Sequence, residues 1–174
     1  MDARQMTGMQ LSDLIDRYGR DLTGMCYLYL KDVTLSQDAM QEVWILVYRK
    51  WDQFHGKSNI KTWLTRITIN VCKTMLRTRW HKDTVVGTEL IEEIPDTDDY
   101  SERIESADMR EGIMHTIEEL PKKYKDVIIL YYYNDLSIAE IADVLSIPSS
   151  TVGTRLDRAR KKLKPYLKEA QYEI

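Results

Sequence analysis

Residues 136–168, LSIAEIADVLSIPSSTVGTRLDRARKKLKPYLK, have the pattern of two short helices joined by a tight turn. The Ser137 side chain can cap the first helix, which is expected to end near Leu145. Apolar residues of this helix recur at the spacing of one helical face: Ile138, Ile141, Ala142 and Leu145. Pro148 lacks a backbone N–H and disfavours helical angles at the residue before it, so the turn falls there. Two helices with so short a connection are typical of a helix-turn-helix, whose second helix enters the major groove of DNA.

The second helix of this pair is expected to be basic on its outer side. Three neighbouring hydroxyl side chains can cap its start: Ser149, Ser150 and Thr151. The expected inner face consists of Val152, Leu156, Ala159 and Leu163, and the outer face of Thr154, Arg155, Arg158, Lys161 and Lys162. Residues 155–168 contain seven Lys or Arg and one acid. This is more positive charge than a helix face needs merely to stay solvated, so a polyanion is the favoured partner.

Charge is segregated along the chain. The 174 residues carry a formal net charge of −3, and 43% of them are apolar, which indicates a globular rather than a disordered protein. Residues 49–82 hold nine Lys or Arg and one acid, whereas residues 83–119 hold thirteen acids and two Arg. Two basic blocks therefore flank an acidic one, and the net charge hides the signal for nucleic acid.

The acidic block indicates the boundary between two domains. Turn formers and acidic residues dominate residues 83–105, which are predicted to be a flexible linker. A DNA mimic that folds back on the basic blocks is the alternative, but a linker kept extended by self-repulsion is favoured. The predicted domains are residues 1–82 and 106–174, and the second is expected to begin with helices over residues 106–120 and 122–134.

Residues 1–82 show helical periodicity. Helices are predicted over residues 10–30, 36–51 and 58–79, and no segment alternates for long enough to be a strand. The predicted fold class is all-α, with two small helical domains. The core stripe of the first helix is Leu11, Leu14, Ile15, Tyr18, Leu22, Met25 and Cys26. The next two helices are expected to bury Ala39, Val43, Leu46 and Val47, and Ile60, Trp63, Leu64, Ile67 and Val71.

The third predicted helix combines cations with nearby aromatic rings. Its outer positions are Lys61, Arg66, Asn70, Lys73, Arg77 and Arg79, and the rings are Phe54, Trp63 and Trp80. Such a surface suits unstacked bases, because stacking is worth about 1 to 3 kcal/mol per base. Trp63 also fits the apolar core, which is the favoured interpretation for it. The Asn70 amide can contact a base edge or bridge two helices by a hydrogen bond, and the sequence leaves both open.

No pattern indicates a cofactor, a metal site or catalysis. Cys26 and Cys72 are distant in sequence and lack metal-binding spacing, so two buried thiols in a reducing compartment are expected. No nucleophile with a neighbouring base and no glycine-rich phosphate loop stands out. No signal peptide or membrane span is indicated either. The expectation is a cytoplasmic protein that is not an enzyme and has no cofactor, metal or small-molecule substrate.

Three segments of the chain resemble the extracytoplasmic-function sigma factors, the small two-domain promoter-recognition subunits of bacterial RNA polymerase. They are DAMQEVWILVYRKWDQF (residues 38–54), KTWLTRITINVCKTMLR (61–77) and LPKKYKDVIILYYYNDLSIAEIADVLSIPSSTVGTRLDRARKKL (120–163). The first is similar to the region 2 helix that docks on polymerase, the second to the segment with WLxRIxxN spacing that follows it, and the third to region 4. Any one could occur in an unrelated helical protein, but all three in this order around an acidic linker are specific.

The resemblance implies a role for each set of residues. Core polymerase would be contacted by Asp38, Gln41, Glu42, Trp44 and Arg49. The opened downstream promoter element, from which a base is captured, would meet Phe54, Lys61, Trp63, Arg66, Asn70, Lys73 and Arg77. The upstream duplex element would meet Ser150, Thr151, Thr154, Arg155, Asp157, Arg158 and Lys161. Arg158 is the expected bidentate contact to guanine, worth about 1 to 3 kcal/mol of discrimination.

Two residues depart from the family pattern. Gly153 stands where the family usually has Lys or Arg, which removes a cation and weakens the helix by about 1 kcal/mol relative to alanine. Asp157 would be repelled by phosphate but can accept a hydrogen bond from the amino group of cytosine. Both affect the identity of the upstream sequence rather than the mode of docking.

The expected function is that of an alternative sigma factor, which binds core RNA polymerase, directs it to promoters and assists DNA opening. An anti-sigma protein, often anchored in the membrane, is the expected regulatory partner. Two other classes fit parts of the sequence. A free-standing helix-turn-helix repressor or activator would need a dimer interface or a ligand domain. An adaptor or decoy would bind protein partners only.

Overall fold

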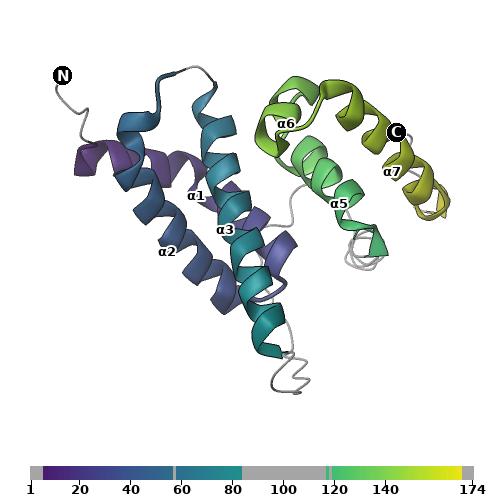
Figure 1. Ribbon diagram of the computed structural model, residues 1–174, viewed down its shortest axis with the longest axis horizontal. Helices are drawn as coiled ribbons and strands as arrows, with labels where there is room; N and C mark the ends of the chain where they lie inside the picture. Colours follow the sequence, from purple (N-terminus) through teal and green to yellow (C-terminus); the bar gives the residue numbers. More distant parts are fainter. Residues whose placement is uncertain (1–5, 57, 84–116, 118, 170–174) are drawn as a thin grey trace. The chain divides into compact units, whose positions relative to one another are not determined.

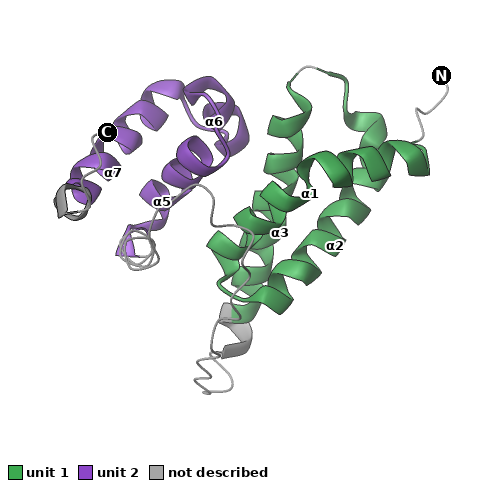
Figure 2. Ribbon diagram, turned by 180° about the vertical axis from the view of Figure 1, so that it is seen from behind, with its two compact units in different colours: residues 1–92 green, residues 93–174 purple. Residues whose placement is uncertain are grey.

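The computed structural model describes residues 6–56, 58–83, 117 and 119–169, and the chain forms two compact units, Met1–Glu92 and Glu93–Ile174 (Figure 2). Every regular element in the described part of the chain is a helix, so the predicted all-α class with two helical units is confirmed. The predicted linker beyond residue 83 and most of the helix predicted over residues 106–120 lie outside the described residues.

The first unit is a bundle of three helices, α1 (Gly8–Leu30), α2 (Val33–Arg49) and α3 (Ile60–Asp83), with a short 3-10 turn, η1 (Trp51–Gln53), after α2 (Figure 1). Each of the three helices packs against the other two. α1 begins slightly earlier than predicted because a capping box closes its first turn. The Thr7 hydroxyl accepts a hydrogen bond from the Gln10 backbone, and the Gln10 side chain accepts one from the Thr7 backbone.

The start of α2 differs from the prediction. Ser36 was the expected first residue, but α2 begins at Val33 because Asp32 caps it, accepting a hydrogen bond from the Leu35 N–H at 2.9 Å. Ser36 is instead 2% exposed, and its hydroxyl donates to the Asp32 carbonyl oxygen at 2.6 Å. The chain reaches this cap from α1 through Lys31, whose φ of 55° is left-handed. A two-residue connection therefore fixes α1 against α2.

The core of the first unit lies where the three helices meet. Its fully buried side chains come from all three: Met25, Cys26, Ala39, Val43, Val47, Leu64 and Cys72. The prediction that the whole apolar stripe of α1 is core is wrong, because Ile15 is 39% exposed and the other members before Leu22 are only partly buried. The buried residues of α1 begin at Leu22, so the enclosed part of this helix is its C-terminal half.

α3 is buried over a wider arc than its apolar stripe predicts. Ile69 and three threonines, Thr62, Thr65 and Thr68, are buried beside the expected apolar residues. The reason is that α3 packs against both α1 and α2, so two of its faces are covered. The Thr68 hydroxyl is satisfied within the helix, where it donates to the Leu64 carbonyl oxygen at 2.9 Å.

The tertiary structure brings the two cysteines together. Cys26 on α1 and Cys72 on α3 are both free and completely buried, so the expectation of two buried thiols is confirmed. The Cys72 side chain, together with burial, raises the pKa of Cys26. The Cys26 thiol also lies 3.5 Å from the Met40 sulfur, to which it donates. These side chains behave as apolar packing between helices.

The second unit contains α5 (Lys122–Ile128), a π-helical segment, η3 (Ile129–Tyr133), α6 (Ile138–Leu145) and α7 (Ser149–Glu169) (Figure 1). The helix predicted over residues 122–134 is present, but its second half is π-helical rather than α-helical. The Asn134 N–H donates to the Ile129 carbonyl oxygen at 3.1 Å, five residues back, which widens the turn. The adjacent rings of Tyr131 and Tyr132 lie within this widened turn.

α6 and α7 form the predicted helix-turn-helix. The Ser137 hydroxyl accepts from the Glu140 N–H, while the Glu140 carboxylate accepts from the Ser137 N–H at 2.9 Å, a capping box. α6 ends at Leu145 as predicted, followed by Ser146 in a left-handed conformation. The four predicted inner residues of α7 are all buried: Val152, Leu156, Ala159 and Leu163. Burying this face leaves the opposite, basic side of α7 toward solvent.

Candidate nucleic-acid interface

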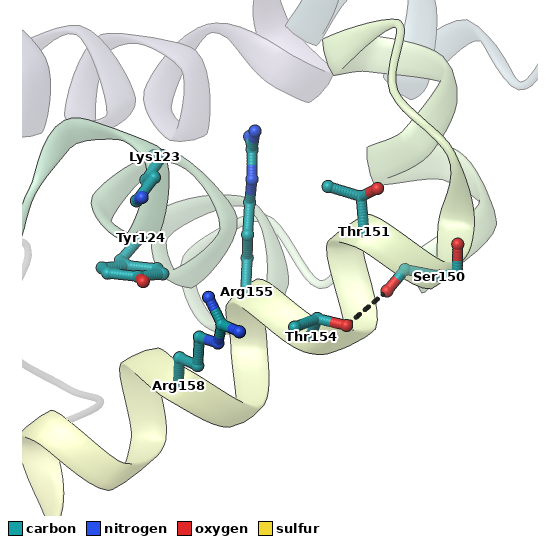
Figure 3. A pocket seen from close by; sticks show the side chains of 7 residues that line it. All are labelled: Lys123, Tyr124, Ser150, Thr151, Thr154, Arg155 and Arg158. Carbon is teal, nitrogen blue, oxygen red and sulfur yellow. Dashed lines mark hydrogen bonds between the residues drawn. The ribbon is translucent and has the colours of Figure 1, made fainter.

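The outer face of α7 borders an open hollow of about 270 Å³. Figure 3 shows the side chains that line it, which come from α7 and from the first turn of α5. They are Ser150, Thr151, Thr154, Arg155 and Arg158 from α7, and Lys123 and Tyr124 from α5. The spacing of the last four α7 residues places them on one helical face. Five of the seven predicted upstream-element residues are thus gathered at one surface, which we call the α7 hollow.

Sequence reasoning missed the two α5 residues of the α7 hollow. Lys123 and Tyr124 lie 25 or more residues before the helix that they face, so no local pattern links them to it. The Tyr124 side chain is buried in the second unit, with 8% of the residue exposed. The Lys123 ammonium lies 5.1 Å from the centre of the Tyr124 ring. Position 123 adds a cation to a surface that the helix-turn-helix pattern assigned to α7 alone.

The α7 hollow is electrostatically positive. The Arg158 guanidinium, with smaller contributions from Lys123 and Lys162, lowers the pKa of the Tyr124 phenol below its ordinary value, although burial acts in the opposite direction. Nearby cations favour an anion at this place. A surface of this sign, lined by hydroxyl and guanidinium donors, suits phosphate and the acceptor edges of bases.

Two predicted upstream residues, Asp157 and Lys161, lie outside the α7 hollow and pair with each other. The Lys161 ammonium is 3.0 Å from the Asp157 carboxylate, one helical turn away, and both side chains are well exposed. An exposed pair of this kind is worth only about 0.3 to 0.5 kcal/mol. The pair therefore shields Asp157 in the free protein without preventing either residue from meeting DNA.

Arg160 is the α7 cation that turns away from the hollow. Its Nε donates to the Tyr132 hydroxyl at 2.7 Å, and its guanidinium lies 5.2 Å and 5.6 Å from the Tyr131 and Tyr132 ring centres. These contacts, chiefly the one to Tyr132, raise the pKa of Arg160. Arg160 thus joins α7 to the π-helical segment, which is a structural contact rather than a DNA-facing one.

Gly153 can be replaced without a clash, which gives a direct test of how much this glycine destabilises α7. A Cβ built at this position meets no atom within 4 Å. We expect Gly153→Ala to raise the free energy of unfolding of the second unit by about 1 kcal/mol, because alanine is the better helix former. Chemical denaturation followed by circular dichroism measures this. Gly153→Lys should give a smaller gain in stability but tighter duplex binding; identical DNA affinities for the two variants would contradict a DNA-facing position.

In the first unit, three aromatic rings meet beside the N-terminal end of α3. Phe54 and Trp63 have ring centres 5.2 Å apart, and Trp51 lies 5.7 Å from Phe54 and 6.2 Å from Trp63. Both Phe54 and Trp63 are half-buried, so Trp63 packs within the cluster and keeps part of its ring exposed. The sequence analysis missed Trp51, whose indole N–H is buried without a hydrogen-bond partner in the described structure. A partly exposed cluster of rings is a surface on which a base can stack.

The polar side of α3 continues from this aromatic cluster. Trp63, Asn70 and Arg77 follow one another at seven-residue intervals and therefore share one face of the helix. Asn70 and Arg77 are exposed, whereas Lys61, Arg66 and Lys73 are partly buried. Asn70 has no side-chain hydrogen bond to another described residue, so the helix-bridging alternative gains no support. The amide is free to meet a base edge.

The outer face of α2 carries polar side chains around two exposed apolar ones. Asp38, Gln41, Glu42 and Arg49 are exposed, and Ile45 and Tyr48 are 45% and 54% exposed among them. Ile45 and Tyr48 were not predicted as site residues, although they are three positions apart and therefore share one face of α2. Trp44 differs from the other predicted polymerase-facing residues: it is half-buried, and its ring lies beside Gly19 of α1.

Neither a metal site nor a membrane-spanning helix is found in the described residues. No group of three or more His, Cys, Asp or Glu side chains there is placed to hold a metal ion. No helix within the same residues combines the length and apolar character that crossing a membrane requires.

The helix-turn-helix with its basic hollow is the arrangement of a DNA-binding protein. Two family models match the chain: Sigma-70 region 2 over residues 14–82, and Sigma-70 region 4 over residues 110–163. The chain is 32% identical to the ECF RNA polymerase sigma factor SigW of Bacillus subtilis, covering 91% of this chain and 89% of that protein. It is 33% identical to the RNA polymerase sigma-H factor of Pseudomonas aeruginosa, with 90% and 88% covered.

Solved structures agree in fold. The sigma factor RpoE of Bartonella quintana, in complex with the anti-sigma factor NepR, matches with a TM-score of 0.74 at 21% identity, covering 90% of this chain and 98% of that chain. CnrH in complex with the cytosolic domain of CnrY matches with a TM-score of 0.67 at 21% identity, with 95% and 92% covered. The chain belongs to the extracytoplasmic-function sigma factors of the sigma-70 family. It is a promoter-specific transcription initiation factor.

Proposed function

We propose that this sigma factor binds its partners through three surfaces. The outer face of α2 binds core polymerase, and the α3 face with its aromatic cluster binds the opened downstream element. The α7 hollow binds the upstream duplex. The observation that carries this assignment is the α7 hollow, because five residues expected at duplex DNA line one positive surface there. A protein that only mimicked region 4 for protein partners would not need such a surface.

The downstream surface is suited to a single strand rather than a duplex. Phe54 and Trp63 offer ring faces for stacking, and the exposed Asn70 amide offers one donor and one acceptor for a base edge. Extruding a base costs a few kcal/mol, and stacking together with an amide contact can offset that amount. Lys61, Arg66, Lys73 and Arg77 would meet the phosphates of the same strand.

The α2 face is suited to a protein partner. Exposed apolar side chains encircled by polar ones are the arrangement found at protein interfaces. Ile45 and Tyr48 would supply the apolar centre, and Asp38, Gln41, Glu42 and Arg49 the polar rim. Trp44 would support this face from beneath by packing against α1.

Replacing Ile45 tests the α2 assignment. We expect Ile45→Asp to weaken binding to core polymerase by about 30-fold or more, because a charge would enter the centre of the interface. Titration of labelled protein with core polymerase measures the affinity. Met9→Asp is the matched control, since Met9 is an exposed apolar residue of α1 rather than of α2. Equal affinities of the two variants would exclude Ile45 from the interface, and unchanged melting temperatures would show that both variants fold.

We also propose that the chain acts by binding alone. Polymerase performs the chemistry, and this protein needs no cofactor, metal or small-molecule substrate. A cytoplasmic location follows from that partner, and an anti-sigma protein would hold the factor inactive. The matched structures of RpoE with NepR and of CnrH with CnrY support an anti-sigma partner for this chain. Where such a partner is anchored in the membrane, the sigma factor would be retained there with it.

Run-off transcription tests the proposed function. Core polymerase would be supplied with a genomic promoter library, with and without this protein. We expect transcripts that appear only with the protein, and their aligned start sites should reveal both promoter elements. Binding to core polymerase without any protein-dependent transcript would instead indicate an adaptor or decoy. Tight duplex binding by the isolated protein, with polymerase having no effect, would indicate a free-standing repressor or activator.

A further inference from the structure

We infer that Tyr124 is a positioning residue for Arg158: its phenol oxygen holds the guanidinium in one orientation at the α7 hollow, so that the remaining N–H groups face a single base pair. The inference rests on the proposed function of the α7 hollow in contacting the upstream duplex. It assigns a role in DNA specificity to α5, a helix outside the helix-turn-helix itself.

The placement of the two side chains carries the inference. Tyr124 enters the hollow from α5 and Arg158 from the third turn of α7. In Figure 3 the Arg158 guanidinium lies beside Tyr124, whereas the Arg155 side chain is extended away from it. Tyr124 is 8% exposed, so its ring is fixed by packing and its hydroxyl is held at the edge of the hollow. A fixed acceptor therefore stands next to a long and flexible donor.

The chemistry of the pair explains what this contact would achieve. A guanidinium has five N–H groups and no acceptor, so a phenol oxygen can take one of them while two others remain for the O6 and N7 atoms of guanine. Without such a contact, an exposed arginine must lose its side-chain freedom when it meets the base. Such a contact would remove part of that freedom before DNA arrives.

The electrostatics agree with this geometry. The Arg158 guanidinium is the main cause of the lowered pKa of Tyr124. The Lys123 ammonium, 5.1 Å from the ring centre, acts in the same direction, as does Lys162. Because Lys123 sits over the ring, it leaves the hydroxyl edge to Arg158. The two α5 residues therefore have separate roles, with Lys123 contributing charge and Tyr124 contributing orientation.

The test combines Tyr124→Phe, Arg158→Ala and the double variant in the full-length protein. Tyr124→Phe keeps the ring and its packing but removes the hydroxyl. Tyr131→Phe is the matched control, because that hydroxyl lies beside Arg160, outside the hollow. A duplex library randomised upstream of a fixed downstream element is transcribed with core polymerase, and the selected sequences give the discrimination at each base pair.

We expect Tyr124→Phe to reduce discrimination by about 3- to 10-fold at the base pair that Arg158 contacts, with the other positions unchanged. The double variant should be no worse than Arg158→Ala, and Tyr131→Phe should match the unmodified protein. A uniform loss at all positions, additive losses in the double variant, or no loss would each overturn the inference. A uniform loss for Arg158→Ala itself would also overturn it, yet would leave the sigma-factor function standing.

A second measurement is independent of transcription. The Tyr124 ring signal is followed by NMR during a pH titration of ring-labelled protein. The signal is assigned to Tyr124, among the eleven tyrosines, because it is missing from the spectrum of Tyr124→Phe. A cation favours the phenolate, so removing it in Arg158→Ala should raise the pKa of Tyr124 toward about 10. A Tyr124 pKa that is the same in both proteins would overturn the contact, whatever the transcription experiment shows.

Discussion

Replacing Asn70 with alanine is expected to reduce open-complex formation by about 5- to 150-fold while leaving the affinity for core polymerase unchanged. The amide is exposed on the same face of α3 as Trp63 and has no side-chain hydrogen bond to another described residue, so its removal should not weaken the fold. The range corresponds to one amide contact to a base, worth about 1 to 3 kcal/mol. Opening is measured with a fluorescent base analogue in the downstream element, and binding by titration with core polymerase.

Gln37→Ala provides the control for Asn70. It removes an exposed amide of similar size from α2, where no contact to the opened strand is proposed, and its affinity for core polymerase is measured as well because Gln37 lies beside Asp38 and Gln41. Normal opening with Gln37→Ala and reduced opening with Asn70→Ala would support base contact. Equal losses of binding and opening with Asn70→Ala would mean that Asn70 supports the structure of the first unit instead.

Arg158→Ala should relax selectivity at one upstream base pair by about 5- to 150-fold and leave the other positions nearly unchanged. The reason is that a bidentate arginine contact to guanine contributes about 1 to 3 kcal/mol of discrimination. Arg158 is exposed on the third turn of α7 and lines the α7 hollow. Transcription from the randomised upstream library measures the preference at every position in one experiment.

Lys162→Ala is the informative comparison for Arg158→Ala. Lys162 is also exposed, one turn further along α7, but does not line the hollow. Its loss should weaken binding to all sequences equally and reduce the salt dependence of affinity by about one counterion, as for a phosphate contact. If Arg158→Ala behaved in the same way, Arg158 would be a phosphate contact and the base preference would belong to other residues.

The Asn70 and Arg158 experiments test the α3 face and the α7 hollow, which the sequence predicted to different degrees. The inner and outer faces of α7 were predicted correctly, because burial of Val152, Leu156 and Ala159 follows from helical spacing alone. The cap at Ser137 was likewise predictable, since a capping box is formed by residues three apart. Where the deciding contacts are local, sequence patterns are sufficient.

Two of the errors originate in contacts between helices. Ile15 fits the apolar stripe of α1, yet it is exposed, and the buried residues of that helix begin only at Leu22. Trp63 fits the stripe of α3 but lies in a cluster with Trp51 and Phe54, at the edge of the core. Periodicity shows which side of a helix is apolar, but it cannot show how far along the helix a partner extends.

The sequence by itself determined the all-α class, the helix-turn-helix and its basic face, and the family resemblance, because each depends on residues close together in the chain. Only the tertiary structure decided that Lys123 and Tyr124 join that face, that Ile45 and Tyr48 stay exposed on α2, and that Cys26 meets Cys72. These pairings connect different helices, and their geometry is set by how whole helices pack against one another. No spacing within a single helix contains that information.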